Sequence, residues 1–166
     1  MKRVVIVRHG KAVPYGYEDD FSRDLRDRGK NDAKRIRHEL NERGILADVI
    51  ISSPAKRAIK TARIFADELG FNRSEILQNQ DLYGGLTTDE FLDIIRELPA
   101  EANTVFFFGH NPGFYYFVCN LLEEFWGDMP TSSTVAIDFE VSDWQQVETR
   151  SGKLGFQLVP RMFKSK

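Results

Sequence analysis

Short apolar runs alternate along this chain with segments that have the spacing of amphipathic helices, and this alternation limits the folds it can adopt. We predict strands at 3–7, 48–52, 75–78 and 103–108. We predict helices over 27–43, from Ser53-Pro54 through Leu69, over 87–98, and from Pro112 to about Phe125. Strands that alternate with helices of this length favour an α/β fold, in which an at least partly parallel sheet carries helices on both faces.

The C-terminal part of the sequence breaks this alternation. The segments 134–141, 144–149 and 155–159 look like strands joined by polar turns, with no helix between them. Such a run of strands indicates a mixed edge on the sheet. Because no internal repeat, linker or low-complexity segment is visible, we predict one α/β domain over residues 1–166.

Composition limits the partners and the compartment. The chain has 166 residues, 42% of them apolar, which is enough for one sizeable core. A formal net charge of -2 gives no general attraction to nucleic acid or to an acidic membrane surface. No signal peptide or transmembrane run is visible, and the single Cys119 cannot form an internal disulfide, so we expect a cytoplasmic protein.

Polar, chemically active residues interrupt the pattern at three points, each where a predicted buried strand ends. These points are 8–10, 52–57 and 109–113. The carboxyl ends of parallel strands share one edge of a sheet, and ligands bind at that edge. If the three strands are parallel, two histidines and two arginines meet there, namely Arg8, His9, Arg57 and His110.

This combination of side chains is suited to a phosphoryl group. Arginine binds two oxygens at once with its planar fork and stays charged, and helix N-termini favour an anion at the same place. A histidine at a rigid strand end can attack phosphorus through one ring nitrogen, while a backbone carbonyl holds the other nitrogen. A second histidine can bind the phosphate oxygens.

Each motif alone has a simpler explanation. An Arg-His pair after a strand is usually structural, Ser53-Pro54 is a good helix start, and Gly-His-Asn-Pro is a turn that leads into a helix. The occurrence of all three motifs at the ends of predicted strands is much less easily explained by chance. We expect His38, in a charged helical segment, to face solvent, and the three histidines lack the spacing of a zinc site.

Taken together, the motifs closely resemble the histidine phosphatase superfamily, whose members include the phosphoglycerate mutases. The resemblance rests on RHGKA at 8–12, SSPAKRAIKTA at 52–62 and GHNPG at 109–113. The segment DFSRDLRDRGK at 20–30 and the compact length are most similar to the SixA-type branch of bacterial phosphohistidine phosphatases. The resemblance implies a three-layer α/β/α sandwich with a mixed, mostly parallel sheet, as in phosphoglycerate mutase-like folds.

The resemblance also implies roles for single residues. His9 would be the nucleophile that becomes phosphorylated, Arg8 and Arg57 would clamp the phosphate, and His110 would complete the pocket. We therefore expect these four residues to be catalytic, and Arg8, Arg57 and His110 to bind the substrate. The chemistry of the family requires no metal, so we expect no cofactor and no metal ligands.

Many superfamily members carry a Glu or Asp general acid after the third strand, and this sequence departs from that pattern. The corresponding region reads QDLYGGLTTDE, with Tyr83-Gly84-Gly85 where the acid is expected. An alkoxide leaving group wants a proton during P–O cleavage, whereas an imidazole, whose conjugate acid has a pKa of about 6.5, needs it far less. The departure therefore favours phosphoramidate substrates. Four aspartates stay open as acids: Asp20, Asp24, Asp81 and Asp89.

The spacing of the motifs bears on the size of the substrate. The stretch from Thr61 to His110 is filled by a helix end, a short strand and another helix, which leaves no room for a capping subdomain. An open, shallow site admits a phosphorylated side chain on a folded protein. The aromatic residues near the motifs are candidates to line the approach, although such residues more often belong to a core: Tyr15, Tyr17, Phe21, Tyr83 and Phe114.

We therefore predict a metal-independent phosphohistidine phosphatase. Its partner would be a phosphorylated protein, of which a histidine phosphotransfer domain is one candidate, and we expect no nucleic-acid or membrane partner. A phosphomonoesterase for small phosphorylated molecules is an alternative if one of the four aspartates supplies a proton. A non-catalytic phosphate-binding regulatory module is another, although binding alone would not need a nucleophile.

Overall fold

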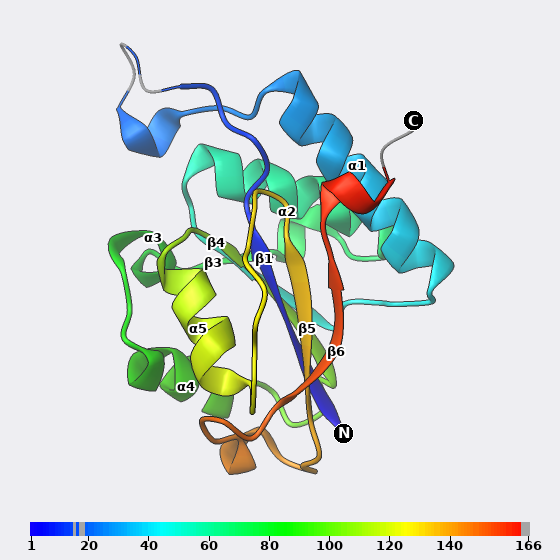
Figure 1. Cartoon of the computed structure of the whole chain (residues 1–166), viewed down its shortest axis with the longest axis vertical. Coiled ribbons are helices and arrows are strands. Elements are labelled where there is room, and N and C mark those ends of the chain that lie inside the picture. The colour runs from blue at the N-terminus through cyan, green and yellow to red at the C-terminus, as the bar shows by residue number, and fades with distance from the viewer. Residues whose placement is uncertain (15, 17–18, 164–166) are drawn as a thin grey trace.

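The computed structural model of the protein describes residues 1–14, 16 and 19–163, with a sheet running through the middle (Figure 1). The strands are β1 Lys2–Arg8, β2 Val49–Ser52, β3 Leu77–Gln78, β4 Thr104–Gly109, β5 Thr134–Phe139 and β6 Lys153–Leu158. Their order in the sheet is β3-β2-β4-β1-β5-β6. The first four strands of this order run parallel to one another. β5 pairs antiparallel with β1, and β6 pairs antiparallel with β5. The predicted mixed, mostly parallel sheet is confirmed.

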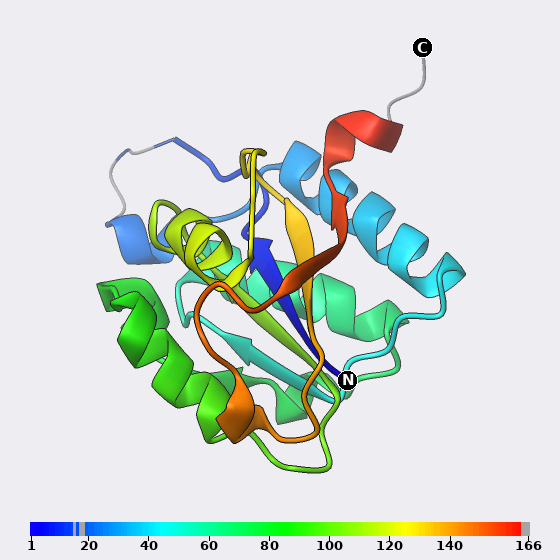
Figure 2. The same cartoon turned by 60° about the horizontal axis from the view of Figure 1, so that its bottom comes forward.

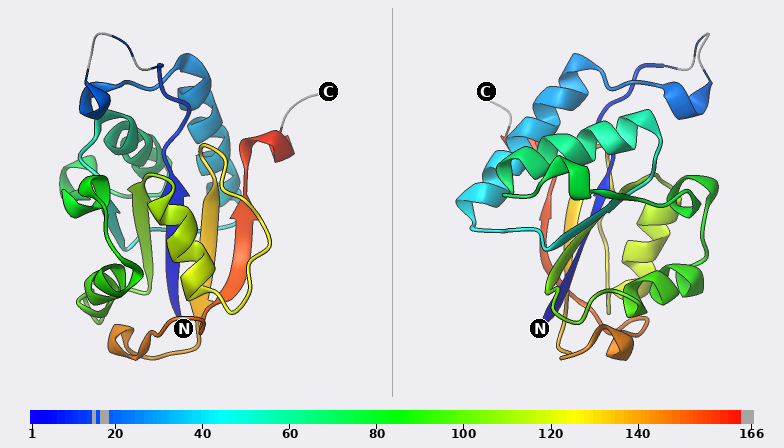
Figure 3. Two further views of the ribbon diagram at one scale, coloured as in Figure 1. Left: turned by 60° about the vertical axis from the view of Figure 1, so that its left-hand side comes forward. Right: turned by 180° about the vertical axis from the view of Figure 1, so that it is seen from behind.

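Helices cover both faces of the sheet. α1 (Asp27–Glu42) and α2 (Lys56–Glu68) lie on one face, and α4 (Thr88–Arg96) and α5 (Gly113–Leu121) lie on the other (Figures 2 and 3). A one-turn helix, α3 (Asp81–Gly84), follows β3. The chain therefore has the three-layer α/β/α sandwich of phosphoglycerate mutase-like folds, as predicted.

The alternation of side chains along the central strand creates two separate cores. Successive residues of a strand point to opposite faces. Val5 and Val7 therefore pack on the α1–α2 side, whereas Val4 and Ile6 pack on the α4–α5 side. β1 is thus buried on both faces, and its carboxyl end is fixed in place.

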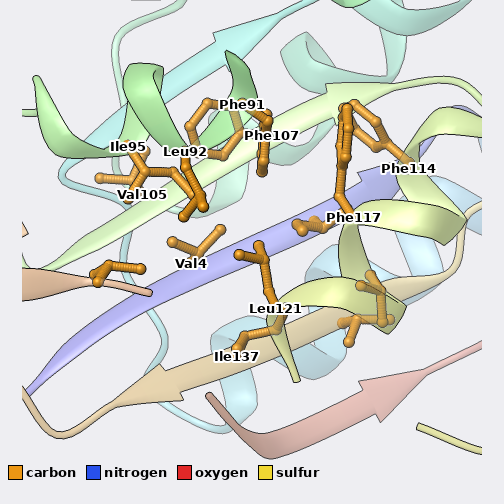
Figure 4. Close-up of a cluster of buried hydrophobic side chains, with 14 of the residues drawn as sticks. Val4, Phe91, Leu92, Ile95, Val105, Phe107, Phe114, Phe117, Leu121 and Ile137 are labelled. Carbon is orange, nitrogen blue, oxygen red and sulfur yellow. The ribbon is translucent and has the colours of Figure 1, made fainter. Parts of the chain in front are cut away.

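The core on the α4–α5 side is rich in phenylalanine (Figure 4). The rings of Phe91 and Phe117 stack with centroids 4.3 Å apart, and Phe91 meets Phe107 edge-on at 4.8 Å. Aromatic pairs of this kind add roughly 0.5–1.5 kcal/mol beyond the burial of their surface. These contacts lock α4 and α5 onto β4, the strand that leads into His110.

The described residues between β1 and α1 are held by local contacts. Ala12 and Leu25 form an isolated antiparallel bridge. Between them, a 3-10 turn over Asp20–Ser22 is capped by the Asp19 carboxylate, which accepts from the Ser22 N–H at 2.9 Å. At the start of α1, the Cα of Gly29 lies so close to the backbone of Lys11 that a Cβ would overlap it. The same segment lies beside α2, because Asp20 pairs with Arg57 and Asp24 pairs with Lys60.

One predicted strand, over 144–149, is wrong. Trp144–Gln146 forms a 3-10 turn, whose cap is the Asp143 carboxylate accepting from the Gln145 N–H at 3.0 Å. The Trp144 side chain is fully buried, and its indole N–H donates to the carbonyl oxygen of Ala102 at 2.9 Å. The cap and the buried indole outweigh the strand preference of this segment.

Two predicted helix ends also differ. α2 begins at Lys56 and not at Ser53-Pro54, because the Ser53 N–H donates to the carbonyl oxygen of Phe108 at 2.9 Å and so continues the sheet pairing. α5 ends at Leu121, before Phe125, because Leu122 turns to extended backbone and pairs with Gly152. Among the described residues, no helix is long and apolar enough to cross a membrane.

Candidate active site

The ends of β1, β2 and β4 bring the predicted residues together at one edge of the sheet. The rings of His9 and His110 lie with their centroids 5.1 Å apart. Nε of Arg57 lies 3.4 Å from Nε2 of His9. Arg8 is adjacent to His9 at the end of β1, and its charge acts on both imidazoles. All four side chains therefore belong to one cluster.

His9 is held in one orientation and one tautomer. Its backbone N–H donates to the carbonyl oxygen of Gly109 in β4 at 3.0 Å, and its own carbonyl oxygen accepts from the Ser132 N–H, in the turn before β5, at 3.1 Å, so both sides of its backbone are fixed. Nδ1 lies 2.8 Å from the carbonyl oxygen of Gly10. A carbonyl can only accept, so Nδ1 carries the proton and Nε2 keeps its lone pair.

Burial keeps His9 neutral. The residue is 9% exposed. Desolvation by this burial, together with the charges around it, lowers the pKa of His9 to about 3, although the hydrogen bond to Gly10 acts in the opposite direction. At neutral pH the imidazole is therefore an uncharged base with a free lone pair, which is the form that can act as a nucleophile.

Arg57 enters the cluster from the first turn of α2 and is 6% exposed. Its backbone carbonyl accepts from the Thr61 hydroxyl at 2.7 Å, and the same hydroxyl accepts from the Gly10 N–H at 3.1 Å. Thr61 thus ties the start of α2 to the residue after His9. This link fixes the distance between the arginine and the histidine.

His110 is half-buried at the end of β4. Its Nε2 lies 2.8 Å from the hydroxyl oxygen of Ser53, and its ring meets that of Tyr83 edge-on, with centroids 5.5 Å apart. Desolvation by burial, followed by the charge of Arg57, lowers the pKa of His110 to about 4. The second histidine is therefore also neutral at pH 7.

Arg8 is supported by the segment before β5. Its Nη1 donates to the carbonyl oxygen of Met129 at 3.0 Å, and the Asn111 side-chain amide donates to the same oxygen at 2.9 Å. Burial lowers the pKa of Arg8 from its ordinary 12.5. Nε of Arg8 is buried without a hydrogen-bond partner among the described residues. A buried cationic donor without an acceptor is suited to binding an anion.

The four aspartates that remained open as acids have separate surroundings. The Asp20 carboxylate contacts Arg57 at 3.0 Å. Asp24 pairs with Lys60 at 2.8 Å and Lys56 at 3.5 Å. Asp81 and Asp89 are exposed. Of these four carboxylates, the structure brings only that of Asp20 into contact with the cluster.

A groove of about 330 Å³ opens beside His110, between α3 and the start of α5. Tyr83 and His110 line it together with Asp81, and Tyr116 stands at its surface with 55% of its area exposed. The group attached to a phosphoryl group near His110 can therefore extend along a preformed surface.

The aromatic candidates divide between core and site. Phe114 is core, whereas Tyr83 contacts Asp20 and His110, and Phe21 meets the Tyr83 ring edge-on at 5.2 Å. Tyr15 and Tyr17 lie outside the described residues. Sequence reasoning missed three supports: Ser53, which the sequence predicts as a helix cap, Thr61, and Arg23, whose Nη1 donates to Asp20 at 2.8 Å. No signal in the sequence marked Thr61 or Arg23.

Comparison with known proteins agrees with this geometry. The family model of the histidine phosphatase superfamily (branch 1) matches residues 4–115, a range that contains the two histidines and two arginines of the cluster. The chain belongs to the histidine phosphatase superfamily. Among the described residues of this superfamily member, no group of three or more His, Cys, Asp or Glu side chains could hold a metal ion.

Two solved structures share the fold over almost the whole chain. The protein histidine phosphatase SixA complexed with tungstate aligns with a TM-score of 0.84 and 22% identity, covering 98% of this chain and 99% of that one. The Agrobacterium tumefaciens protein that carries the name SixA aligns with a TM-score of 0.81 and 25% identity, covering 96% and 98%.

A curated relative matches a shorter region. The serine/threonine-protein phosphatase Pgam5, mitochondrial, of Drosophila grimshawi is 35% identical over 75 residues, which is 45% of this chain. The match covers 26% of that relative, so the chain spans about a quarter of its length. This likeness concerns part of the domain only.

Proposed function

We propose that this protein is a metal-independent phosphatase that removes phosphoryl groups from histidine side chains of a partner protein, through a covalent phosphohistidine at His9. The observation that carries the proposal is the neutral His9 imidazole, whose Nε2 lone pair is directed at Arg57 while Gly10 holds Nδ1. A nucleophile fixed beside two arginines is the minimum that phosphoryl transfer needs.

In the first step, Nε2 of His9 attacks phosphorus and the P–N bond of the substrate breaks. When the free ring nitrogen of the substrate already carries a proton, the substrate imidazole leaves in its neutral form. His9 then holds the phosphoryl group on Nε2 and a proton on Nδ1, and the Gly10 carbonyl stabilises the positive charge of its ring. Arg8 and Arg57 bind the phosphoryl oxygens.

In the second step, water attacks phosphorus and the P–Nε2 bond breaks. The oxygen and both protons of the water remain with the product, which leaves as dihydrogen phosphate, and His9 returns to its neutral form. The two guanidinium groups stabilise the charge on the phosphoryl oxygens, which is where most of the catalysis in such transfers originates.

Phosphohistidine is favoured over phosphomonoesters because, among the described residues, no protonated carboxyl group contacts either histidine of the cluster. The Asp20 carboxylate, which touches the cluster, is held by Arg23 and Arg57 and is ionised. An imidazole can leave without a proton from the enzyme, whereas an alkoxide needs a proton donor. The groove beside His110 gives room for the chain around a phosphorylated side chain, which supports a protein as the substrate.

A phosphomonoesterase is the second candidate, and one observation favours it. Asp81 lines the groove beside His110, where a leaving group would lie. In addition, the Drosophila grimshawi relative is named a serine/threonine-protein phosphatase, and phosphoserine and phosphothreonine are phosphate esters. If Asp81 can reach the leaving oxygen, it would supply the proton that an ester needs.

The test compares the hydrolysis of a phosphohistidine-bearing protein, a phosphoserine peptide and a sugar phosphate, with and without a chelator. The His9→Ala protein serves as the blank. Preference for phosphohistidine, unaffected by the chelator and absent from the variant, is the expected result. Preference for the peptide or the sugar phosphate would favour the esterase, and loss of activity with chelator would overturn the metal-independent mechanism. No hydrolysis at all would point to a phosphate-binding module.

A further inference from the structure

Asp20 joins side chains from three distant parts of the chain. Its Oδ1 accepts from Nη1 of Arg23 at 2.8 Å. Its Oδ2 accepts from Nη2 of Arg57 at 3.0 Å and from the Tyr83 hydroxyl at 2.9 Å. Its backbone carbonyl accepts from Nη1 of Arg57 at 2.6 Å. Both oxygens of the carboxylate and the main chain of the same residue are therefore engaged.

These contacts give the two edges of the Arg57 guanidinium different surroundings. Asp20 binds Nη1 and Nη2 at the outer end, one through its carbonyl and the other through its carboxylate. The Nε side faces His9, with 3.4 Å between Nε and Nε2. Since Nη2 carries a second N–H, the Nε–Nη2 edge keeps two parallel donors. Two parallel donors are what a phosphate binds bidentately.

We propose that Asp20 is a positioning residue for Arg57, holding the outer edge of the guanidinium so that its Nε–Nη2 edge faces the phosphoryl group on His9. The proposal rests on the proposed function, since it gives Asp20 a task in the same phosphoryl transfer. A free arginine side chain loses rotamer entropy when it binds a substrate. Asp20 fixes the side chain before the substrate arrives, which preorganises the donors.

The surroundings of Asp20 fit this task and not that of a proton donor. Desolvation opposes its ionisation, but the hydrogen bonds from Arg23, Arg57 and Tyr83 outweigh it and hold the pKa of Asp20 well below its ordinary 3.8. An ionised carboxylate only accepts hydrogen bonds and has no proton to give. It also balances part of the positive charge that the two arginines bring to the site.

The backbone contact requires the local fold of the first loop. The carbonyl of Asp20 can reach Arg57 because Asp20 begins the 3-10 turn that Asp19 caps. On the other side, the Tyr83 hydroxyl that binds Asp20 belongs to the ring next to His110. Asp20 therefore links the loop after β1, the start of α2 and the wall of the groove.

The test measures phosphate binding and turnover in Asp20→Ala, Asp20→Asn and the control Asp24→Asn. Asp24 lies in the same loop but pairs with lysines and does not touch Arg57. We expect calorimetry to show that the affinity for inorganic phosphate falls about tenfold in Asp20→Ala, which corresponds to about 1.4 kcal/mol. Asp20→Asn, which keeps an acceptor for Arg57, should lose less, and Asp24→Asn should bind as the parent protein does.

Turnover of two aryl phosphates separates positioning from acid catalysis. We expect kcat/KM to fall roughly 10–100-fold in Asp20→Ala, as for other misplaced groups, and by the same factor for p-nitrophenyl phosphate and phenyl phosphate. A proton donor would matter far more for phenyl phosphate, the poorer leaving group. A much larger loss on phenyl phosphate, or unchanged phosphate affinity in both Asp20 variants, overturns the proposal.

The readouts are independent of the identity of the natural substrate. Phosphate binding needs no turnover, so a parent protein that binds phosphate but ignores phosphohistidine would refute the proposed function and still test Asp20. Thermal unfolding of each variant shows whether it is folded. If Asp20→Ala does not fold, Asp20→Asn must show weakened phosphate binding and equal losses on both aryl phosphates, or the proposal fails.

Discussion

The Nε–H of Arg57 is directed at Nε2 of His9 across 3.4 Å, longer than the 2.7–3.2 Å of an ordinary N–H···O hydrogen bond. The contact is therefore weak. It agrees with a lone pair on Nε2, since the proton of the ring is on Nδ1 and directed at Gly10. A phosphoryl group on Nε2 would exchange this weak contact for charge-assisted bonds to the same guanidinium.

Replacing Arg57 with lysine should therefore be costly. Lysine keeps the charge but has a single ammonium group, which cannot bind Asp20 and two phosphoryl oxygens in a fixed plane. We expect kcat/KM to fall by about 10²–10³, the usual effect of removing an electrostatic contact to the reacting group. Steady-state kinetics on a phosphohistidine-bearing protein measures it. Arg63→Lys, at an exposed position of the same helix, is the matched control, and equal activity of the two variants would refute the clamp.

Acid should destabilise the folded protein through the two histidines of the site. The folded-state pKa is about 3 for His9 and about 4 for His110, whereas an unfolded histidine has a pKa of 6.5. Below 6.5 the unfolded chain binds more protons, so the free energy of unfolding decreases as the pH falls toward 4. The slope is about 1.4 kcal/mol per pH unit for each histidine. Above 6.5 neither histidine contributes a slope.

Urea unfolding at several pH values between about 7.5 and 4.5 measures this dependence. His9→Asn and His110→Asn should each lose less stability over this range than the parent protein does. His38→Asn is the control, because His38 is exposed on α1. If the parent protein and all three variants lose stability equally, neither histidine in the site is held neutral by burial.

The meeting of His9 and His110 could be predicted because each follows a run of residues that are buried on both faces of the sheet. Val4–Val7 and Val105–Phe108 contain no polar residue, a pattern typical of central parallel strands. Two parallel neighbours must end at the same edge, so residues that follow them lie together. The structure brings these residues together, and the roles assigned to them stay predictions.

The surroundings of the four residues could not be predicted, because they depend on loop paths that tertiary contacts set. Asp20 and Asp24 lie in one short segment and have the same local sequence preferences, yet one binds Arg57 and the other binds Lys60. That choice depends on how α2 presents its first turn. Tyr83 lies in the segment where the family resemblance predicts an acid, and only the structure shows that its hydroxyl binds Asp20.

Gly29 should be required for the first loop to reach the site. A Cβ at this position would overlap the backbone of Lys11, and backbone cannot move aside as a flexible side chain can. Gly29→Ala should therefore lower the free energy of unfolding by about 1–3 kcal/mol, as overpacking does. It should also reduce turnover, because residues 19–25 would shift away from Arg57. Gly84→Ala, whose Cβ would meet open space, should be neutral in stability.

Tyr116 should contribute to the recognition of a protein substrate but not to the chemistry. It stands 55% exposed at the groove that His110 also lines, and we expect it to contact only the part of a substrate that extends beyond the phosphoryl group. Tyr116→Ala should raise KM for a phosphohistidine-bearing protein about tenfold, the loss typical of an aromatic contact residue. Its kcat, and its kcat/KM for a small phosphoramidate, should stay unchanged.

The comparison of the two substrates decides whether the groove is used. Leu46→Ala, at an exposed apolar position in the connection between α1 and β2, controls for a general loss of surface area. If Tyr116→Ala weakens both substrates equally, the effect reaches the phosphate site itself and the groove has no separate part in recognition. If neither substrate is affected, the partner protein approaches from another side, and the loop over 19–25 becomes the surface to test.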